Sequence, residues 1–286
     1  MVARGSVRAL SMVTTTLERR RSAAVERRPR RKVRLRLHGA VGFLVLIAVG
    51  EIVGRSGIVP PSYLPPSSIV LVRAGELLLD GEFLGHALAT LLAWASGLAL
   101  ALLLAIPIGI VAGTSELAYR ASSALVEFLR PIPSVALIPI AMLSLGTGIE
   151  MKIVLTVYAA FWPIFFNTIS GVHDVDPTAK DTAVSFNYSR WGVLTRVTLP
   201  SAAPHIYTGV RIASAVVLVV AISAELLAGG DAGIGTLIFE ASITGAHADT
   251  VYAATVLTGL LGLGINSALV YVERRMLFWK HSERSA

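Results

Sequence analysis

Cysteine is absent from the 286 residues of this sequence. Its absence excludes a disulfide framework, a thiolate metal site and a cysteine nucleophile. The sequence also contains neither the zinc motif H-E-x-x-H nor the serine hydrolase motif G-x-S-x-G. Four of the histidines, His86, His173, His205 and His247, are scattered singly, without metal-ligand spacing. We therefore expect neither an enzyme active site nor a metal or other cofactor.

Charged residues are scarce. They make up 15% of the chain, whereas soluble domains contain about a quarter. Hydrophobic residues account for 54% and are gathered in long runs. This composition is typical of an integral membrane protein, so we expect an all-α, polytopic fold surrounded by the lipid bilayer.

A helix needs about 20 apolar residues to cross the hydrocarbon core. The apolar runs predict about six transmembrane helices, over residues 37–54, 86–113, 121–145, 151–171, 206–228 and 250–272. The first is the weakest, because it is short and contains Glu51. Pro107 is expected to kink the second, and Arg130 with three nearby prolines interrupts the third.

The predicted spans divide the chain into segments. A proline-rich external segment over 55–85 follows the first span and includes an amphipathic surface helix over 69–79. The remaining five helices form a core over 86–280, and residues 281–286 are a short tail.

Positive charge is concentrated at the N-terminus, where residues 1–38 hold 12 of the 25 lysines and arginines. The tail over 1–36, which we expect to be mostly disordered, could bind nucleic acid, lie on anionic lipid or anchor the chain on the cytoplasmic side. Because a membrane segment follows at once, we favour the anchor and expect no nucleic-acid partner.

The distribution of basic residues among the loops indicates how the chain is oriented in the membrane. With the N-terminus inside, inner segments carry 20 basic residues and outer segments carry 3. The positive-inside rule therefore predicts a multi-pass protein of the cell membrane with both termini in the cytoplasm.

A polar stretch over 176–200 separates two apolar runs and is predicted to face the cytoplasm. Asp176 suits a helix N-cap and Pro177 the first helical position, so we expect a helix over 177–186. Asn187 tolerates a left-handed backbone and is expected to end this helix.

A second helix over 190–197 is predicted to follow, with Ser189 as its N-cap and with Pro200 and Pro204 stopping it. On this pattern alone, the stretch is either an amphipathic surface connector or a segment that binds another protein.

The same stretch resembles the EAA loop of the permease subunits of bacterial ABC importers. That family pattern is Glu-Ala-Ala, then Gly, then Leu-Pro. Here it reads Asp181, Thr182 and Ala183, then Asn187, then Leu199 and Pro200. Aspartate keeps the carboxylate, and asparagine keeps access to the left-handed turn.

Four further segments are similar to the nitrate, sulfonate and taurine branch of these permeases, namely residues 128–148, 161–177, 224–238 and 272–280. The resemblance covers roughly 85–280, the first span only loosely, and the basic tail not at all. The sequence is therefore identified as a member of this permease family.

The resemblance implies a type I ABC importer permease fold. Such permeases work as a pair, commonly two copies of one chain, with two cytoplasmic ATP-binding cassette subunits and an external substrate-binding protein. The six residues that match the EAA pattern are then expected to couple the permease to the ATPase. The sequence contains no G-x-x-x-x-G-K-[ST] motif, so ATP hydrolysis belongs to the partner. Small residues in the second, fifth and sixth spans permit close packing either within a pair or within one chain.

The branch implies a small anion as the substrate, such as a sulfonate, taurine or nitrate. A permease for another small ligand, such as a pyrimidine vitamin precursor, is an alternative, because the external protein supplies most selectivity. A self-contained channel or secondary transporter is a further alternative, although we find no clear internal repeat.

Four polar residues inside the spans are candidates for the translocation path. Glu225 is either a gate or path residue, or an acceptor for backbone amides of the following loop. Arg130 either pairs with Glu127 or the membrane surface, or lines the inward opening. Tyr158 and Asn167 either line the path or form interhelical hydrogen bonds.

Overall fold

A computed structural model describes residues 41–129, 132–244 and 247–277. Within these ranges the chain is helical and has no strand, which confirms the all-α prediction. It divides into two units, residues 1–68 and residues 69–286. The predicted tails, 1–36 and 281–286, lie outside the described residues, as does Arg130.

The first unit contains a helix over residues 41–55, which is the described part of the predicted first span. Glu51, the residue that weakened this prediction, has partners. Its carboxylate pairs with Arg55 at 2.5 Å and accepts the backbone N–H of Ser68 at 2.8 Å. The carboxylate therefore ties the end of this helix to the segment that follows.

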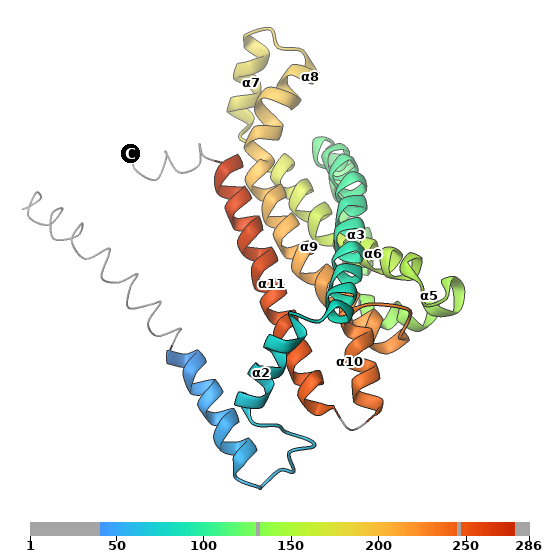
Figure 1. Cartoon of the computed structure of the whole chain (residues 1–286). Helices are drawn as coiled ribbons and strands as arrows, with labels where there is room; N and C mark the ends of the chain where they lie inside the picture. The colour runs from blue at the N-terminus through green and yellow to red at the C-terminus, as the bar shows by residue number, and fades with distance from the viewer. Residues whose placement is uncertain (1–40, 130–131, 245–246, 278–286) are drawn as a thin grey trace, which may run out of the picture. The chain divides into compact units, whose positions relative to one another are not determined.

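The second unit holds most of the helices (Figure 1). They are α2 (Ser67–Leu77), α3 (Gly81–Thr114), α4 (Glu116–Leu129), η1 (Ser134–Leu137), α5 (Ile138–Leu145), α6 (Ile149–His173), α7 (Pro177–Ser185), α8 (Arg190–Val193), η2 (Leu194–Thr198), α9 (Leu199–Ala228), α10 (Ile234–Ile243) and α11 (Ala248–Met276). Helix α2 overlaps the predicted helix over 69–79 but begins and ends two residues earlier.

Five of the predicted spans are recognisable. Helices α3, α6 and α11, and the helical stretch Arg190–Ala228, are long and apolar enough to cross a membrane. The predicted third span is broken, because α4 and the η1–α5 pair are bent by 70°. Pro133 precedes η1 and Pro139 lies in the first turn of α5, where proline starts a helix but does not continue one.

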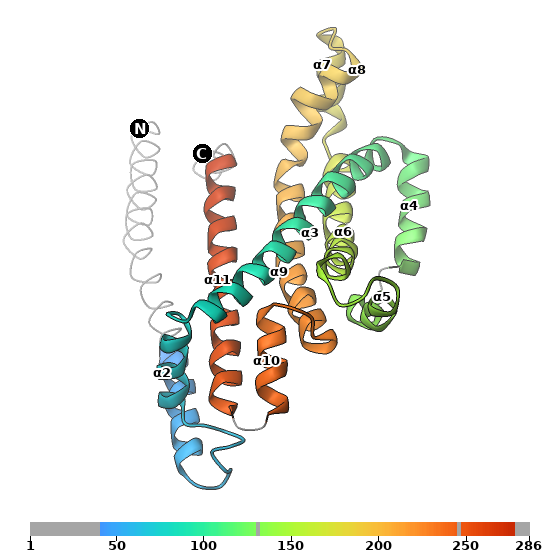
Figure 2. The ribbon, with the colours of Figure 1, turned by 45° about the vertical axis from the view of Figure 1, so that its right-hand side comes forward.

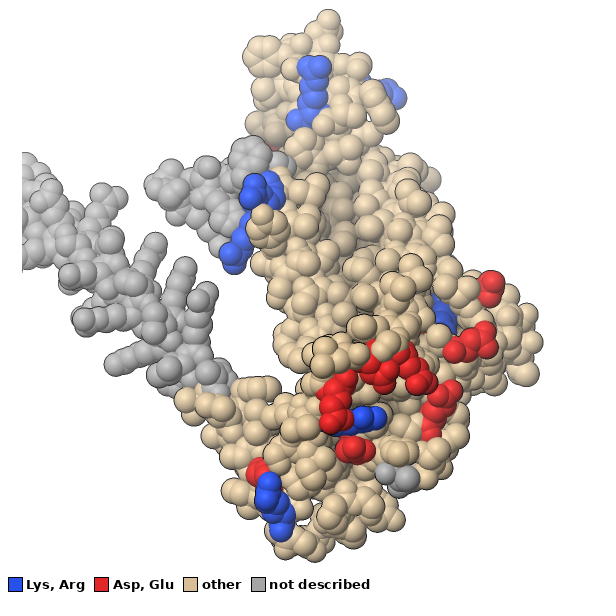
Figure 3. Space-filling view, viewed as in Figure 1, with Lys and Arg blue, Asp and Glu red and all other residues tan. Residues whose placement is uncertain are grey.

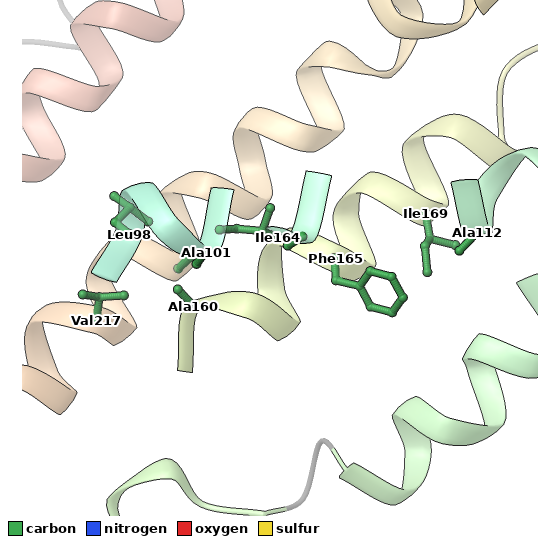
Figure 4. Close-up of a cluster of buried hydrophobic side chains, with 10 residues drawn as sticks. Leu98, Ala101, Ala112, Ala160, Ile164, Phe165, Ile169 and Val217 are labelled. Carbon is green, nitrogen blue, oxygen red and sulfur yellow. The ribbon is translucent and has the colours of Figure 1, made fainter. Parts of the chain in front are cut away.

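Helices α3, α6 and α9 pack against one another around a core of small and aliphatic side chains together with Phe165 (Figure 4). Gly109 of α3 explains how closely α3 approaches α6, since an added Cβ would lie 2.8 Å from the Thr168 side chain. On α11, by contrast, an added Cβ at Gly259 or Gly264 would meet nothing within 4 Å. Small residues therefore permit close packing within the unit on α3, whereas part of α11 is not covered by the described residues of this unit.

The two ends of the second unit differ (Figures 1 and 2). Helices α7 and α8 project at one end, and α10 lies at the other, near the start of α11. Helix α10 was not predicted from the sequence. It has ten residues, too few to span a bilayer. The loop before it has positive φ at Gly229, Gly230 and Gly233, and this loop turns the chain back from α9.

Candidate functional site

The projecting end is built by local capping. The side chain of Asp176 accepts the backbone N–H of Thr178 at 2.8 Å, and Pro177 follows in the first turn of α7. Both features confirm the predicted helix start. Thr182 donates its hydroxyl to the carbonyl of Thr178, while the neighbouring Ala183 is buried.

Asn187 closes α7 as predicted. Its φ of 62° is the one positive value among the described non-glycine residues. Its N–H donates to the Val184 carbonyl at 2.8 Å, and the N–H of Tyr188 donates to the Ala183 carbonyl at 3.1 Å. These two bonds form a Schellman motif, which fixes the direction in which the chain leaves the helix.

The second helix starts as predicted but does not stop as predicted. Ser189 caps α8 by accepting the N–H of Gly192 at 3.2 Å. The expectation that Pro200 and Pro204 end this helix is wrong, because helical structure continues from Arg190 to Ala228. The π-helical turn η2, in which Leu199 N–H bonds to the Leu194 carbonyl, lengthens the hydrogen-bond spacing just before Pro200. The wider turn accommodates the proline, which has no N–H to donate.

Apolar side chains are exposed where α7 turns into α8. Phe186 is 76% exposed, Trp191 72% and Val184 60%. Arg196 lies over the Tyr188 ring at 5.4 Å, which holds the turn against η2. We call residues 184–191 the tip. A rigid, capped turn with exposed aromatic residues is typical of a surface that another protein covers.

A groove of about 920 Å³ lies beside the tip. It is bounded by the end of α3, the start of α4, the end of α6 and the residues of α7, α8 and η2, and its lining includes Glu116, His173, Lys180, Arg190 and Trp191. The His173 ring stacks on Tyr119 of α4, with ring centroids 4.0 Å apart.

Glu225 belongs to a buried polar network at the opposite end of the unit. The side chain has no exposed area. It pairs with Lys152 of α6 at 3.2 Å, accepts the Thr90 hydroxyl at 2.9 Å and accepts the Gly235 N–H at 3.1 Å. Lys152 also donates to the carbonyl of Ala232. The carboxylate therefore accepts a hydrogen bond from a backbone N–H of the glycine-rich segment that follows α9. It is also paired with a cation, Lys152, which the sequence did not indicate.

The same network holds the loop before α10. Ile234 N–H donates to the Thr90 hydroxyl at 2.9 Å, and Gly233 N–H donates to Nδ1 of His86 at 3.0 Å. At Gly233 the φ of 151° and the crowding of the Glu225 carboxylate leave no room for a side chain. Helices α3, α6 and α9 are thus joined to the loop through buried polar groups.

Tyr158 and Asn167 line a separate cavity of about 350 Å³. It lies between η1 and the segment before it, the middle of α6, and α9. Asn167 donates its side-chain amide to the Pro163 carbonyl at 2.8 Å, so part of its polarity is used within α6. The structure brings these two candidates together but places Glu225 in the separate network.

Charge also distinguishes the two ends (Figure 3). Acidic residues gather at the end that holds the start of α3 and α11, and this group includes Glu76, Asp80, Glu82, Glu240 and Asp249. The described cations from α7 to η2 and at the end of α11 are Lys180, Arg190, Arg196, Arg274 and Arg275. The tip is therefore at the end that carries more of the described lysines and arginines, although Asp174, Asp176 and Asp181 also lie there.

Comparison with known proteins gives a consistent result. The putative aliphatic sulfonates transport permease protein SsuC of Bacillus subtilis is 28% identical over 93% of this chain and 96% of its own length. A probable ABC transporter permease protein of Brucella abortus is 32% identical over 85% of this chain and 92% of its own. The nitrate import permease protein NrtB of Leptolyngbya laminosa is 27% identical over 86% of this chain and 89% of its own length.

The fold is also known. A chain of the MetNI methionine ABC transporter, in an inward facing conformation, matches 74% of this chain and 97% of its own length with a TM-score of 0.55. At 19% sequence identity, this likeness concerns the fold alone.

The model of one protein family matches residues 105–278, more than half of the chain. Members of that family are permease subunits, which work with separate ATP-binding subunits and a substrate-binding protein. ATP hydrolysis takes place in those separate subunits and not in the permease. This chain belongs to that family, the inner membrane components of binding-protein-dependent transport systems, and is a permease subunit of an ABC importer.

Proposed function

We propose that the tip is the surface through which ATP-binding subunits move this permease. The observation that supports this most directly is its construction. The Schellman turn at Asn187 fixes α7 against α8, and α8 continues through η2 into the 30-residue helix α9. A displacement of the tip is therefore transmitted to α9 without an intervening flexible loop. The exposed Phe186 and Trp191 supply the apolar contact that such binding needs.

The matched EAA residues take different parts in this proposal. Asp181 and Thr182 are exposed on α7 and face a partner, whereas Ala183 is buried and packs within the chain. Leu199 and Pro200 join the π-helical turn to α9. Asn187 sets the angle between the two short helices.

We place the tip and both termini in the cytoplasm. The basic residues at the tip end support this orientation through the positive-inside rule. At the opposite end, Arg73 is paired with the carboxylate of Glu76, and Lys152 is paired with that of Glu225. That end then receives the substrate-binding protein.

We further propose that two copies of this chain form the path, on two ATP-binding cassette subunits. The uncovered glycines of α11 support pairing, since a second copy can approach there closely. The substrate is a small anion such as a sulfonate, taurine or nitrate. The proposal rests on the relatives named for sulfonate and nitrate transport.

The orientation is tested with single cysteines, because the chain has none of its own. Ser185→Cys lies in the tip and Ser242→Cys lies on α10, and both serines are exposed. In intact cells a membrane-impermeant maleimide should label the Ser242→Cys variant, and it should label the Ser185→Cys variant only after permeabilisation. The reverse pattern would put the tip outside the cell, where no ATP-binding subunit reaches it.

A further inference from the structure

The cavity beside Tyr158 lies halfway along a transmembrane helix. Tyr158 and Trp162 are one turn apart near the middle of α6, which runs from Ile149 to His173. Their rings meet edge to face, with centroids 6.0 Å apart. Both residues line the cavity of about 350 Å³, whose other walls come from α9 and from the η1 region. The cavity is therefore placed near the middle of the membrane, where a permease must pass its solute.

Two hydrogen-bond donors at this cavity are unused. The Tyr158 hydroxyl and the Trp162 indole N–H are covered from solvent and have no hydrogen-bond partner among the described residues. Buried polar groups normally have partners, and Trp94 shows this by donating its indole N–H to the Ser214 carbonyl at 3.1 Å. Both residues line one cavity, but their donor atoms are covered, so a rotation of each side chain is needed to point the donor into that space. Two adjacent unpaired donors so placed indicate that the missing acceptor is a ligand.

The chemistry of the lining restricts that ligand. Among the described residues, no charged side chain lines the cavity, so none of them attracts a cation strongly there. The indole N–H only donates, whereas the Tyr158 and Ser134 hydroxyls both donate and accept, and the Asn167 amide oxygen accepts. Pro163 has no N–H, so the Ala159 carbonyl one turn earlier lacks its usual helical donor. One neutral carbonyl attracts a cation much less strongly than a carboxylate does. The two unpaired groups, the Tyr158 O–H and the Trp162 N–H, therefore favour an acceptor-rich ligand, such as an oxyanion.

The remaining wall is apolar. Ile212 and Val216 of α9, together with Ile132 and Phe166, offer hydrocarbon and aromatic surface to the same space. A bare inorganic anion leaves this surface unused, whereas an anion with a short alkyl group covers it. Neutral donors bind an oxyanion weakly compared with paired charges, and weak binding lets a solute leave the site as well as enter it.

We propose that this cavity is a solute-binding site within the permease itself, specific for a small oxyanion that carries a short apolar group. Tyr158 and Trp162 donate to the oxyanion after a small rotation of their side chains, and the α9 wall contacts the apolar group. The permease then adds its own selectivity to that of the substrate-binding protein. The identity of the solute rests on the anion import proposed above, but the site does not depend on the role of the tip.

Ser134 offers a reporter for this site, because it lines the cavity and the native chain contains no cysteine. The full-length Ser134→Cys variant in detergent is treated with N-ethylmaleimide, and the modification rate is measured with ethanesulfonate, nitrate or ethylammonium present. We expect about 10 mM ethanesulfonate to slow modification about tenfold, because a site with a Kd of about 1 mM is then about nine-tenths occupied. Nitrate should protect less, and ethylammonium should not protect.

Donor-deleting variants identify the contacts. In the Ser134→Cys background, Tyr158→Phe and Trp162→Phe keep the aromatic rings but remove the O–H and N–H. Each should raise the concentration of ethanesulfonate needed for half protection about tenfold, the effect of one hydrogen bond to a charged group. Trp94→Phe, whose indole bonds elsewhere, should leave protection unchanged.

Three results overturn the proposal. The first is no protection by ethanesulfonate, the second is equal protection by ethylammonium, and the third is full protection in the variant that combines Tyr158→Phe and Trp162→Phe. Better protection by nitrate than by ethanesulfonate removes the role assigned to the apolar wall. Because no ATP-binding subunit is present in these measurements, their outcome is independent of the coupling proposed for the tip.

Discussion

Lys152→Met should lower the free energy of unfolding by about 3–5 kcal/mol, because it leaves the Glu225 carboxylate buried without its cation. The pair is among the most enclosed in the described chain, with side-chain exposures of 5% for Lys152 and 0% for Glu225. Thr90 and the Gly235 N–H remain as donors in the variant, but neither neutralises the charge. Denaturant unfolding of the purified chain in detergent measures the loss.

A double-mutant cycle separates the ion pair from the rest of the network. Glu225→Gln alone leaves Lys152 as an uncompensated buried cation and should also destabilise the chain. The combined Lys152→Met and Glu225→Gln variant should recover much of the loss, since the glutamine oxygen still accepts the Gly235 N–H and no buried charge remains.

The matched control is Arg120→Met, which breaks the Arg120–Glu116 pair on α4, whose side chains are 76% and 60% exposed. An exposed pair contributes about 0–1 kcal/mol, so this variant should unfold almost as the wild type does. If Lys152→Met lowered the free energy of unfolding no more than Arg120→Met does, the buried network would not contribute to the stability of the fold.

Asn187→Val should uncouple transport from ATP hydrolysis. The residue has a φ of 62°, a conformation that a β-branched side chain adopts only under strain of roughly 1–3 kcal/mol. Relieving that strain changes the angle between α7 and α8, so the tip no longer presents its two helices in the bound arrangement. Uptake into membrane vesicles should fall about tenfold or more, as this strain energy predicts, while ATP hydrolysis by the complex continues.

Asn187→Gly is the matched control, because glycine adopts the left-handed conformation without strain. It should transport at the wild-type rate. Wild-type uptake by the Asn187→Val variant, in the presence of normal amounts of protein, would show that the turn angle does not matter for coupling.

Local features of the tip could be predicted from sequence because they depend on neighbours in the chain. Asp176 and Ser189 cap helices through the next two or three residues, and Asn187 closes α7 through a bond to Val184. The EAA resemblance drew attention to the same segment. The role of this segment in coupling to an ATP-binding subunit stays a prediction.

Other features depend on tertiary contacts that no local pattern contains. Lys152 stands at the start of the predicted span over 151–171, and it is buried because Glu225, 73 positions later, pairs with it. Proline at position 200 normally predicts a helix end, and here the π-helical turn before it allows the helix to continue. The short helix α10 has too few residues to be recognised as a span, and the loop before it is held by partners on α3, α6 and α9.

The most direct test of the central claim places a photo-crosslinking amino acid at Trp191 in the tip of the full chain in native membranes. Leu79, 88% exposed at the opposite end of the unit, serves as the control position. After irradiation, position 191 should form an adduct with a protein that contains the G-x-x-x-x-G-K-[ST] motif, and position 79 should not. An adduct with that protein from position 79, or none from position 191 in membranes with intact ATP-driven uptake, would contradict the account.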